Sequence, residues 1–229
     1  MSVEVDKARH VYSISNRFSF LELTTHVTIT LMKKYIIGID EVGRGPLAGP
    51  VCLCAVRVEA GMYRRLQKSK DLPAVGRDSK KLSKKDREKY SKVLCDFALE
   101  GKIDFTIVMQ SNAVIDTKGL SFAIKKALAG CLQKVGATEK DIVLLDGGLK
   151  APAEFANQQT IIKGDEKHPV IAWASILAKV HRDNYMTKMA KKYPEYGFEK
   201  HMGYGTKVHR DAIQKHGPSS VHRRSFLHS

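Results

Sequence analysis

The sequence predicts an α/β domain with a mixed central sheet flanked by helices and a small helical region at its C-terminal end. Two apolar segments typical of strands come first, Tyr35–Asp40 and Val51–Val58, and glycines and prolines punctuate the link between them. Segments of helical and strand character then alternate, which is the order expected of helices packed on a mixed sheet. With 229 residues, 43% of them hydrophobic, the chain is long enough to bury a sizeable core.

The later elements follow from periodicity and from residues that start helices. Ser83 is a suitable N-cap, and Pro169 suits the first position of a helix. The first half of the helix that Pro169 opens is apolar on nearly all sides, so we expect it to be buried. In chain order we expect a helix from Ser83 to about Leu99, a strand at Ile103–Met109, a helix at Lys118–Val135, strands at Ile142–Asp146 and Thr160–Ile162, a long helix from Pro169 to about Lys192, and a short helix around Ala212.

Residues 1–31 differ from the rest of the chain. They carry no net charge and lack helical periodicity, although Val27, Ile29 and Leu31 alternate with threonines as in a short strand. Met32 is followed at once by two lysines and the first strand, so it resembles a natural start. We expect residues 1–31 to be a disordered leader or the result of a misassigned start codon. Residues 32–229 should form a single domain that includes the C-terminal helical region.

The charge balance indicates a polyanionic partner. The formal net charge is +15, all of it after residue 31, and nucleic acid is a better candidate than an anionic membrane. From Lys179 onward the chain has eleven Lys or Arg and four Asp or Glu, a net charge of +7, so this region is a candidate phosphate-facing surface. No apolar run is long enough to cross a bilayer, and no signal peptide is visible. The four cysteines form no C-x-x-C pair and suit a reducing cytoplasm.

Four acids fall at the ends of apolar segments. Asp40 and Glu41 end the first strand, Asp146 ends another strand, and Asp183 follows the apolar half of the long helix. Acids at the carboxyl ends of strands commonly line a functional crevice, and Mg²⁺ or Mn²⁺ would relieve the repulsion between them. Each acid alone has an ordinary alternative, as a cap, a turn residue or a solvated helix residue. Neighbouring strand residues point to opposite faces, so Asp40 and Glu41 can share a site only if the chain bends there, which Gly43 and Gly45 make easy.

Two glycine-flanked residues are candidates for contact with nucleic acid. Gly43 and Gly45 flank Arg44, so a ligand can approach the backbone closely while the arginine offers a fork for phosphate. Tyr204 also lies between glycines in a basic region, as a stacking ring would. The alternatives are a plain turn and a partly buried loop tyrosine. Six of the nine histidines follow residue 180, and we interpret them as added basic surface or loop contacts.

A series of motifs resembles one known family. The stretch Ile37–Val51, IGIDEVGRGPLAGPV, is similar to the opening signature of the ribonuclease HII family, and Arg44 favours this family over the sister ribonuclease HIII. The resemblance covers essentially Lys33 to Phe226. Further motifs follow in the family's order: Asp78–Leu82, Leu145–Gly147, Lys163–Asp165, Ala174–Asp183, Gly203–Thr206 and His222–Phe226.

The resemblance implies a ribonuclease H-like fold and a metal-dependent endonuclease. Such an enzyme acts as a monomer on the RNA strand of RNA–DNA hybrids and on ribonucleotides embedded in duplex DNA, which it nicks on the 5′ side to leave 5′-phosphate and 3′-hydroxyl ends. It would serve ribonucleotide excision repair and DNA replication. Two rivals stay open: a DNA junction resolvase of the same fold, and a non-catalytic nucleic-acid binder. The resemblance assigns two Mg²⁺ or Mn²⁺ ions to Asp40, Glu41, Asp146 and Asp183, and recognition of the RNA–DNA junction to Gly43, Arg44, Gly45 and Tyr204.

Overall fold

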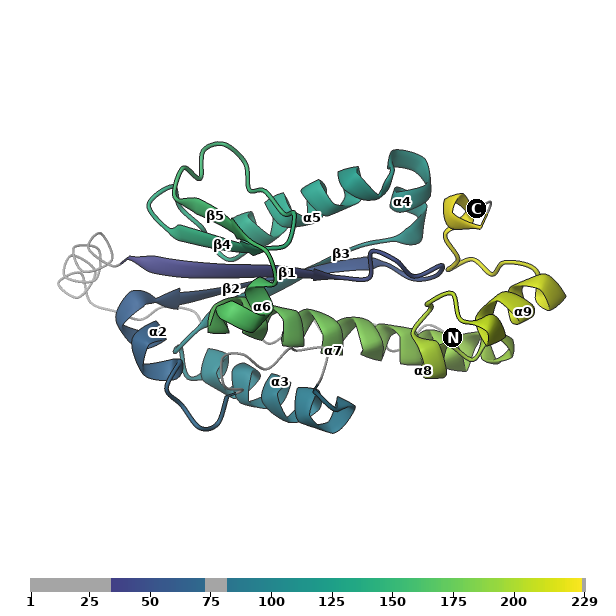
Figure 1. Ribbon diagram of the computed structural model, residues 1–229, viewed down its shortest axis with the longest axis horizontal. Helices are drawn as coiled ribbons and strands as arrows, with labels where there is room; N and C mark the ends of the chain where they lie inside the picture. The colour runs from purple at the N-terminus through teal and green to yellow at the C-terminus, as the bar shows by residue number, and fades with distance from the viewer. Residues whose placement is uncertain (1–33, 73–81, 228–229) are drawn as a thin grey trace, which may run out of the picture. The chain divides into compact units, whose positions relative to one another are not determined.

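A five-stranded mixed sheet forms the centre of the computed structural model, which describes residues 34–72 and 82–227. Its strands lie in the order β3-β2-β1-β4-β5 (Figure 1). The pairs β1–β2 and β2–β3 are antiparallel, whereas β1–β4 and β4–β5 are parallel, so the predicted mixed sheet is confirmed. The expectations for residues 1–31 and the Asp78–Leu82 motif fall wholly or mostly outside the described residues. The strands are β1 (Tyr35–Val42), β2 (Val51–Glu59), β3 (Asp104–Gln110), β4 (Ile142–Asp146) and β5 (Gln158–Ile161).

The longer helices and the short helix around Ala212 lie where the sequence predicts them, and the other short helices of the described residues were not predicted. Ser83 caps the first long helix through a hydrogen bond from the Asp86 amide, and Pro169 opens the longest one. The predicted helix at Lys118–Val135 is wrong at its start, because Gly119 has φ +84° and separates two helices there. The helices are α2 (Ala60–Leu66), α3 (Lys84–Leu99), α4 (Asn112–Lys118), α5 (Leu120–Lys134), α6 (Gly164–Lys167), α7 (Pro169–Lys192), α8 (Phe198–His201) and α9 (Lys207–His216), with 3₁₀ turns η2 (Pro194–Tyr196) and η3 (Arg224–Phe226).

The helices cover both faces of the sheet. One buried cluster joins α5 to residues of β1, β2 and β4, and a second joins α3 and α7 to the opposite face (Figure 1). The predicted burial of the first half of α7 is confirmed, since Trp173 is 0% exposed. A Cβ on Gly38 of β1 would lie 2.4 Å from the backbone of Val170, so only glycine lets α7 lie this close to the sheet.

The predicted C-terminal helical region is present and has a core of its own. The last third of α7 packs there with η2, α8 and α9 around buried Tyr196 and Phe198. An isolated bridge between Ala48 and His222 joins this region to the segment that follows β1. The part of the chain that the structure describes contains no helix that is both long enough and apolar enough to cross a membrane.

Candidate active site

Two of the predicted acids lie side by side on neighbouring parallel strands. Ile39 of β1 pairs with Leu145 of β4, so the residues that follow them, Asp40 and Asp146, occupy equivalent positions on the α7 face. Asp40 is buried, with 6% of its surface exposed. The amide of Gly164, the first residue of α6, donates a hydrogen bond of 2.6 Å to Oδ1 of Asp146. This end of the sheet therefore holds two carboxylates close together, one of them buried.

The electrostatics of this end oppose full ionisation. Burial raises the pKa of Asp40 well above its ordinary value, a hydrogen bond from Ser175 lowers it, and the charges of Asp146 and Glu41 raise it further. Burial likewise raises the pKa of Glu41, with Asp146 adding to the increase and Arg44 opposing it. Carboxylates that repel one another in a buried setting are typical of a site that binds a cation.

Glu41 reaches this group from the other face of the strand. β1 keeps its pairing with β2 through Val42, so the bend lies at Gly43, which has φ +92°, and not between Asp40 and Glu41. The Glu41 side chain is only 8% exposed. Its Oε1 accepts a 2.9 Å hydrogen bond from Arg44, while its Oε2 is buried without a hydrogen-bond partner among the described residues. One carboxylate oxygen is thus left for a ligand.

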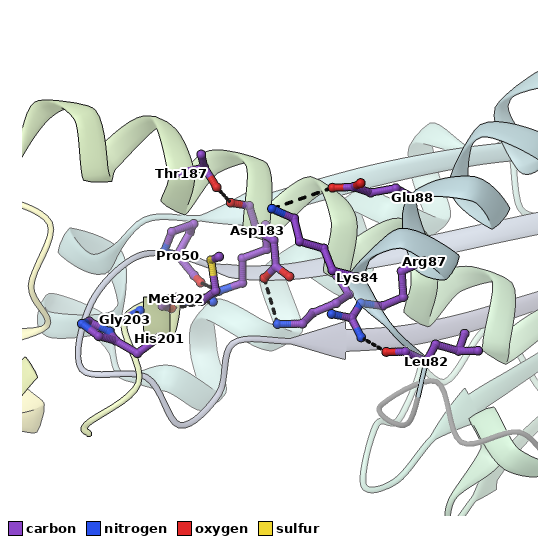
Figure 2. Close-up of polar contacts among 12 residues, drawn as sticks. Pro50, Leu82, Lys84, Arg87, Glu88, Asp183, Thr187, His201, Met202 and Gly203 are labelled. Atoms are coloured by element: carbon purple, nitrogen blue, oxygen red, sulfur yellow. Dashed lines mark hydrogen bonds and ion pairs between the residues drawn. The ribbon is translucent and has the colours of Figure 1, made fainter. Parts of the chain in front are cut away.

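Asp183 is buried on α7 and paired with a lysine. Its Oδ1 lies 2.8 Å from Nζ of Lys179, one helical turn earlier, and its carbonyl oxygen accepts a hydrogen bond from Thr187 (Figure 2). With 8% of its surface exposed, it is not the solvated helix residue of the alternative interpretation. Within residues 34–72 and 82–227, no three acidic, histidine or cysteine side chains converge closely enough to hold a metal ion.

The donors present nevertheless fit a divalent cation. All four are carboxylates, the oxygen ligands that Mg²⁺ and Mn²⁺ prefer. The unpaired Oε2 of Glu41 and the raised pKa of Asp40 both indicate positive charge that the described residues do not supply. The structure brings Asp40, Glu41 and Asp146 into electrostatic contact, and Asp183 interacts instead with Lys179.

Two loops that are far apart in sequence are joined beside these acids. The first loop, Gly43–Pro50, connects β1 to β2, and the second loop, Gly203–Thr206, connects α8 to α9. The amides of Leu47 and Ala48 donate hydrogen bonds of 2.8 and 3.3 Å to the carbonyl of Gly203. A Cβ on Gly203 would lie 2.6 Å from the carbonyl oxygen of Ala48, so glycine permits this contact.

Of the predicted contact residues, Arg44, Gly45 and Tyr204 are exposed on these loops, whereas Gly43 is buried against Arg182. The side chain of Arg44 is 53% exposed, and Tyr204 is 41% exposed. A Cβ on Gly45 would meet no atom within 4 Å, so the first loop is open to approach at that residue. The guanidinium of Arg182 lies 6.0 Å from the centroid of the Tyr204 ring and borders the ring from the protein side.

A buried arginine next to Asp183 holds the two loops together. Arg182 is 0% exposed and donates three hydrogen bonds, to the carbonyl oxygens of Ala48, Pro50 and Met202, at 3.1, 3.0 and 3.0 Å. Arg182 is therefore not part of the phosphate-facing surface predicted for the region from Lys179 onward. A planar guanidinium can donate to several carbonyls at once, and these hydrogen bonds offset the free-energy cost of burying its charge.

A second buried arginine holds the start of the first loop. Arg223 is also 0% exposed, and its guanidinium donates to the carbonyls of Gly43, Arg44 and Gly49 at 2.6, 2.9 and 2.9 Å. It too is not part of the predicted phosphate-facing surface. The only sequence signal for such a role is the glycine-rich loop itself, whose irregular backbone leaves carbonyl groups to be satisfied.

Three of the late histidines are buried and so are not basic surface, but they make the loop contacts that were the other interpretation. His201, His209 and His222 are 9%, 0% and 1% exposed, and their rings lie together beneath the second loop. His209 hydrogen-bonds to the carbonyl of Tyr204 at 2.9 Å. The cluster is a packed polar network, and its spacing in the sequence indicated nothing of this.

Comparisons with known proteins agree with the fold and with the family that the motifs resemble. A family model described as ribonuclease HII matches residues 37–229. The ribonuclease HII of Caldicellulosiruptor bescii is 44% identical over 194 residues, which cover 85% of this chain and 87% of that protein. The crystal structure of ribonuclease H2 from Pyrococcus horikoshii OT3 has a TM-score of 0.64 at 24% identity, covering 83% of this chain and 93% of that one. The crystal structure of Bst ribonuclease HIII in complex with Mn²⁺ has a TM-score of 0.57 at 17% identity, covering 89% of this chain and 69% of that one.

The mixed sheet with its flanking helices is a ribonuclease H-like fold, as the likeness to these solved structures shows. This confirms the predicted fold class. The chain belongs to the ribonuclease HII family. It is accordingly an enzyme, a hydrolytic endonuclease of the ribonuclease H type.

Proposed function

We propose that the protein cleaves the RNA strand of RNA–DNA hybrids and nicks duplex DNA on the 5′ side of embedded ribonucleotides, leaving 5′-phosphate and 3′-hydroxyl ends. One observation carries the proposal: Asp40 and Asp146 lie at equivalent positions of adjacent parallel strands, with the unpaired Oε2 of Glu41 beside them. A buried group of carboxylates at a strand end fits metal-assisted hydrolysis of a phosphodiester.

We infer that Asp40, Glu41, Asp146 and Asp183 hold two divalent cations, Mg²⁺ or Mn²⁺. Bound cations of this kind activate water and stabilise the leaving 3′ oxygen. Buried Asp40 and neighbouring Asp146 supply negative charge at the sheet end, and Asp183, buried on α7 beside Lys179, is the fourth proposed ligand. The Mn²⁺ complex of the ribonuclease HIII neighbour supports the choice of metal.

Recognition of the substrate is assigned to the two loops. Gly45 leaves the backbone of the first loop open to the 2′-hydroxyl, and Gly43, which packs against Arg182 and Pro50, would contribute backbone groups of the same turn. The exposed Arg44 would contact a phosphate. The ring of Tyr204 would pack on the deoxyribose that follows the ribonucleotide, where a second 2′-hydroxyl would crowd it. Exposed lysines of α7 and α9 would hold the duplex through its phosphates without reading base sequence.

The cellular setting is part of the same proposal. We infer a monomer that works in the cytoplasm, in ribonucleotide excision repair and DNA replication, on nucleic acid and not on a membrane. The four cysteines of the described residues are free, which supports a reducing compartment.

The test compares cleavage of three substrates by the purified protein. They are a duplex with one ribonucleotide, a long RNA–DNA hybrid, and a branched all-DNA junction, each with Mg²⁺, with Mn²⁺ and with chelator. We expect the first two to be cut only with metal and the third not at all. Cutting of the all-DNA junction would favour a resolvase. Binding without cutting in both metals would favour a non-catalytic nucleic-acid binder.

A further inference from the structure

Two buried histidines hold the backbone of the second loop at neighbouring residues, one at Gly203 and one at Tyr204. The Gly203 amide donates a 3.2 Å hydrogen bond to Nδ1 of His201, and the Tyr204 carbonyl lies 2.9 Å from Nδ1 of His209. The rings of His201 and His209 stack with centroids 4.4 Å apart. Tyr204 is thus an exposed residue of a loop whose backbone is hydrogen-bonded to buried imidazoles.

The hydrogen-bond partners determine where the protons lie. A carbonyl oxygen only accepts, so Nδ1 of His209 carries a proton and donates it to Tyr204. Nε2 of a neutral His209 is then an acceptor, and His222 must donate to it through its own Nε2, 3.0 Å away. That leaves Nδ1 of His222 to accept the 2.9 Å hydrogen bond from the Ser219 amide.

The third histidine fits the same arrangement. Nδ1 of His201 accepts from Gly203, so its Nε2 carries the proton and donates to the carbonyl of Tyr196 at 2.9 Å. Every ring nitrogen of the three histidines therefore has a partner of the opposite kind. Burial lowers the pKa of His209 and lowers that of His222 to about 4, which agrees with neutral rings at these two residues.

We propose that His209 is a positioning residue for Tyr204, holding its carbonyl through Nδ1–H while His222 locks His209 in that tautomer. The inference rests on the proposed role of Tyr204 at the junction. The carbonyl and the ring of Tyr204 share one Cα, so a carbonyl held at one point limits the directions in which the ring can project. His209 touches no part of the substrate site directly, and its effect passes through Tyr204.

A pair of substitutions separates the two nitrogens of His209. The amide nitrogen of Asn lies where Nδ1 of histidine lies, whereas that of Gln lies where Nε2 lies. His209→Asn should keep the bond to Tyr204 and retain kcat/KM on a single-ribonucleotide duplex to within about threefold. His209→Gln should lower it by about tenfold, as expected for the loss of one buried hydrogen bond. On a long hybrid, where no deoxyribose follows the cut, both variants should stay near the parent. His216→Asn, at an exposed position of α9, is the matched control.

The double variant shows whether the effect passes through Tyr204. If it does, adding His209→Gln to Tyr204→Ala should cause no further loss of kcat/KM on the single-ribonucleotide duplex. A further tenfold loss there, or equal activity of His209→Asn and His209→Gln, would overturn the inference while leaving the proposed function intact. If Tyr204→Ala itself behaves like the parent on the single-ribonucleotide duplex, the junction role of Tyr204 fails, and the role of His209 fails with it.

A measurement on the unmodified protein does not depend on whether the variants fold. Nitrogen-15 NMR distinguishes the two neutral tautomers of histidine. We expect His209 protonated at Nδ1, and His201 and His222 protonated at Nε2. Finding His209 protonated at Nε2 would contradict the inference directly.

Discussion

The acids at the end of β1 and β4 and the histidines beneath the second loop are both buried, yet they meet the cost of burial differently. Among the described residues, Oε2 of Glu41 has no hydrogen-bond partner, and Asp40 and Asp146 repel one another. The three histidines, by contrast, match each donor with an acceptor and carry no charge. The acids are therefore incomplete without a cation, whereas the histidines are complete as they stand.

This difference indicates which group acts and which group supports. Buried polar groups in proteins are nearly always satisfied, and those left unsatisfied are commonly found where a ligand binds. The two buried arginines belong with the histidines, since each donates three hydrogen bonds to loop carbonyls. Removing an acid should thus harm activity more than stability, and disturbing a histidine or an arginine should harm stability first.

The largest effect is expected from Asp40→Asn. Cleavage should fall by about a thousandfold because a metal-binding charge is lost. The pKa of Asp40 is raised, so its charge is costly at neutral pH, and the free energy of unfolding without metal should rise in the variant. Kinetics with Mg²⁺ and denaturant titrations in chelator measure the two effects. Asp104→Asn, at an exposed position of β3, should change neither. If the Asp40→Asn protein were both active and less stable, Asp40 would have a structural role like that of the buried arginines and histidines.

The next effect concerns pH and His222. Its pKa is about 4 in the folded protein and ordinarily 6.5, because burial and the nearby His209 oppose the charge. Between these values the unfolded chain binds a proton that the folded protein does not. The contribution of neutral His222 to the free energy of unfolding is therefore fully present above pH 6.5 and is lost as the pH falls toward 4. This contribution amounts to about 3 kcal/mol.

Denaturant titrations between pH 7.5 and 4.5 test this, with His222→Gln as the comparison. Glutamine keeps a donor toward His209 but cannot titrate, so the parent should lose more stability than the variant across this range. Carboxylates titrate in both proteins and cancel in the difference. Parallel curves for the two proteins would mean that His222 is protonated alike in the folded and unfolded states.

The sequence predicted the acids at the ends of β1 and β4 far better than it predicted the buried arginines and histidines that hold the two loops. Asp40 and Asp146 follow apolar runs of strand length, and the carboxyl ends of parallel strands meet at one edge, so their proximity follows from a local pattern. The strands and the long helices were predictable for the same reason. The short helices α2, α4, α6 and α8 were not, because four to seven residues are too few to establish a period.

The buried arginines and histidines could not be predicted from local pattern. Their residue types are ordinarily exposed, and their burial depends on carbonyl groups far away in the sequence, as the contact between Arg223 and Gly43 illustrates. The expected bend at Asp40 and Glu41 was misplaced for a similar reason. β1 is held straight through Val42 by its pairing with β2, which only the folded sheet provides.

A smaller effect is expected from Arg223→Lys. Lysine keeps the charge but presents one nitrogen, which cannot reach the three carbonyls that the guanidinium satisfies. Losing two of these hydrogen bonds should cost about 2 kcal/mol of unfolding free energy. Activity on a single-ribonucleotide duplex should fall as well, because Gly43 and Arg44 lose their support. Arg224→Lys is the matched control, since that side chain is exposed. Equal losses in the two variants would argue against a supporting role for Arg223.

The smallest effect concerns Asp183, which lies between the two classes because it is an acid of the proposed metal site that already has a partner. Nζ of Lys179 is 2.8 Å from its Oδ1, so a cation must share this carboxylate with an ammonium group. Removing the positive charge in Lys179→Met should therefore tighten Mn²⁺ binding, measured by calorimetry without substrate. The side chain of Lys179 is 26% exposed, and solvent screens the pair, so we expect a gain of about threefold and a change in stability below about 1 kcal/mol. Lys84→Met, which breaks an exposed pair of the same spacing with Glu88 (Figure 2), should leave Mn²⁺ binding unchanged. Weaker Mn²⁺ binding by Lys179→Met would instead show that the lysine holds Asp183 in place for the metal, and would group Lys179 with the buried arginines as a supporting residue.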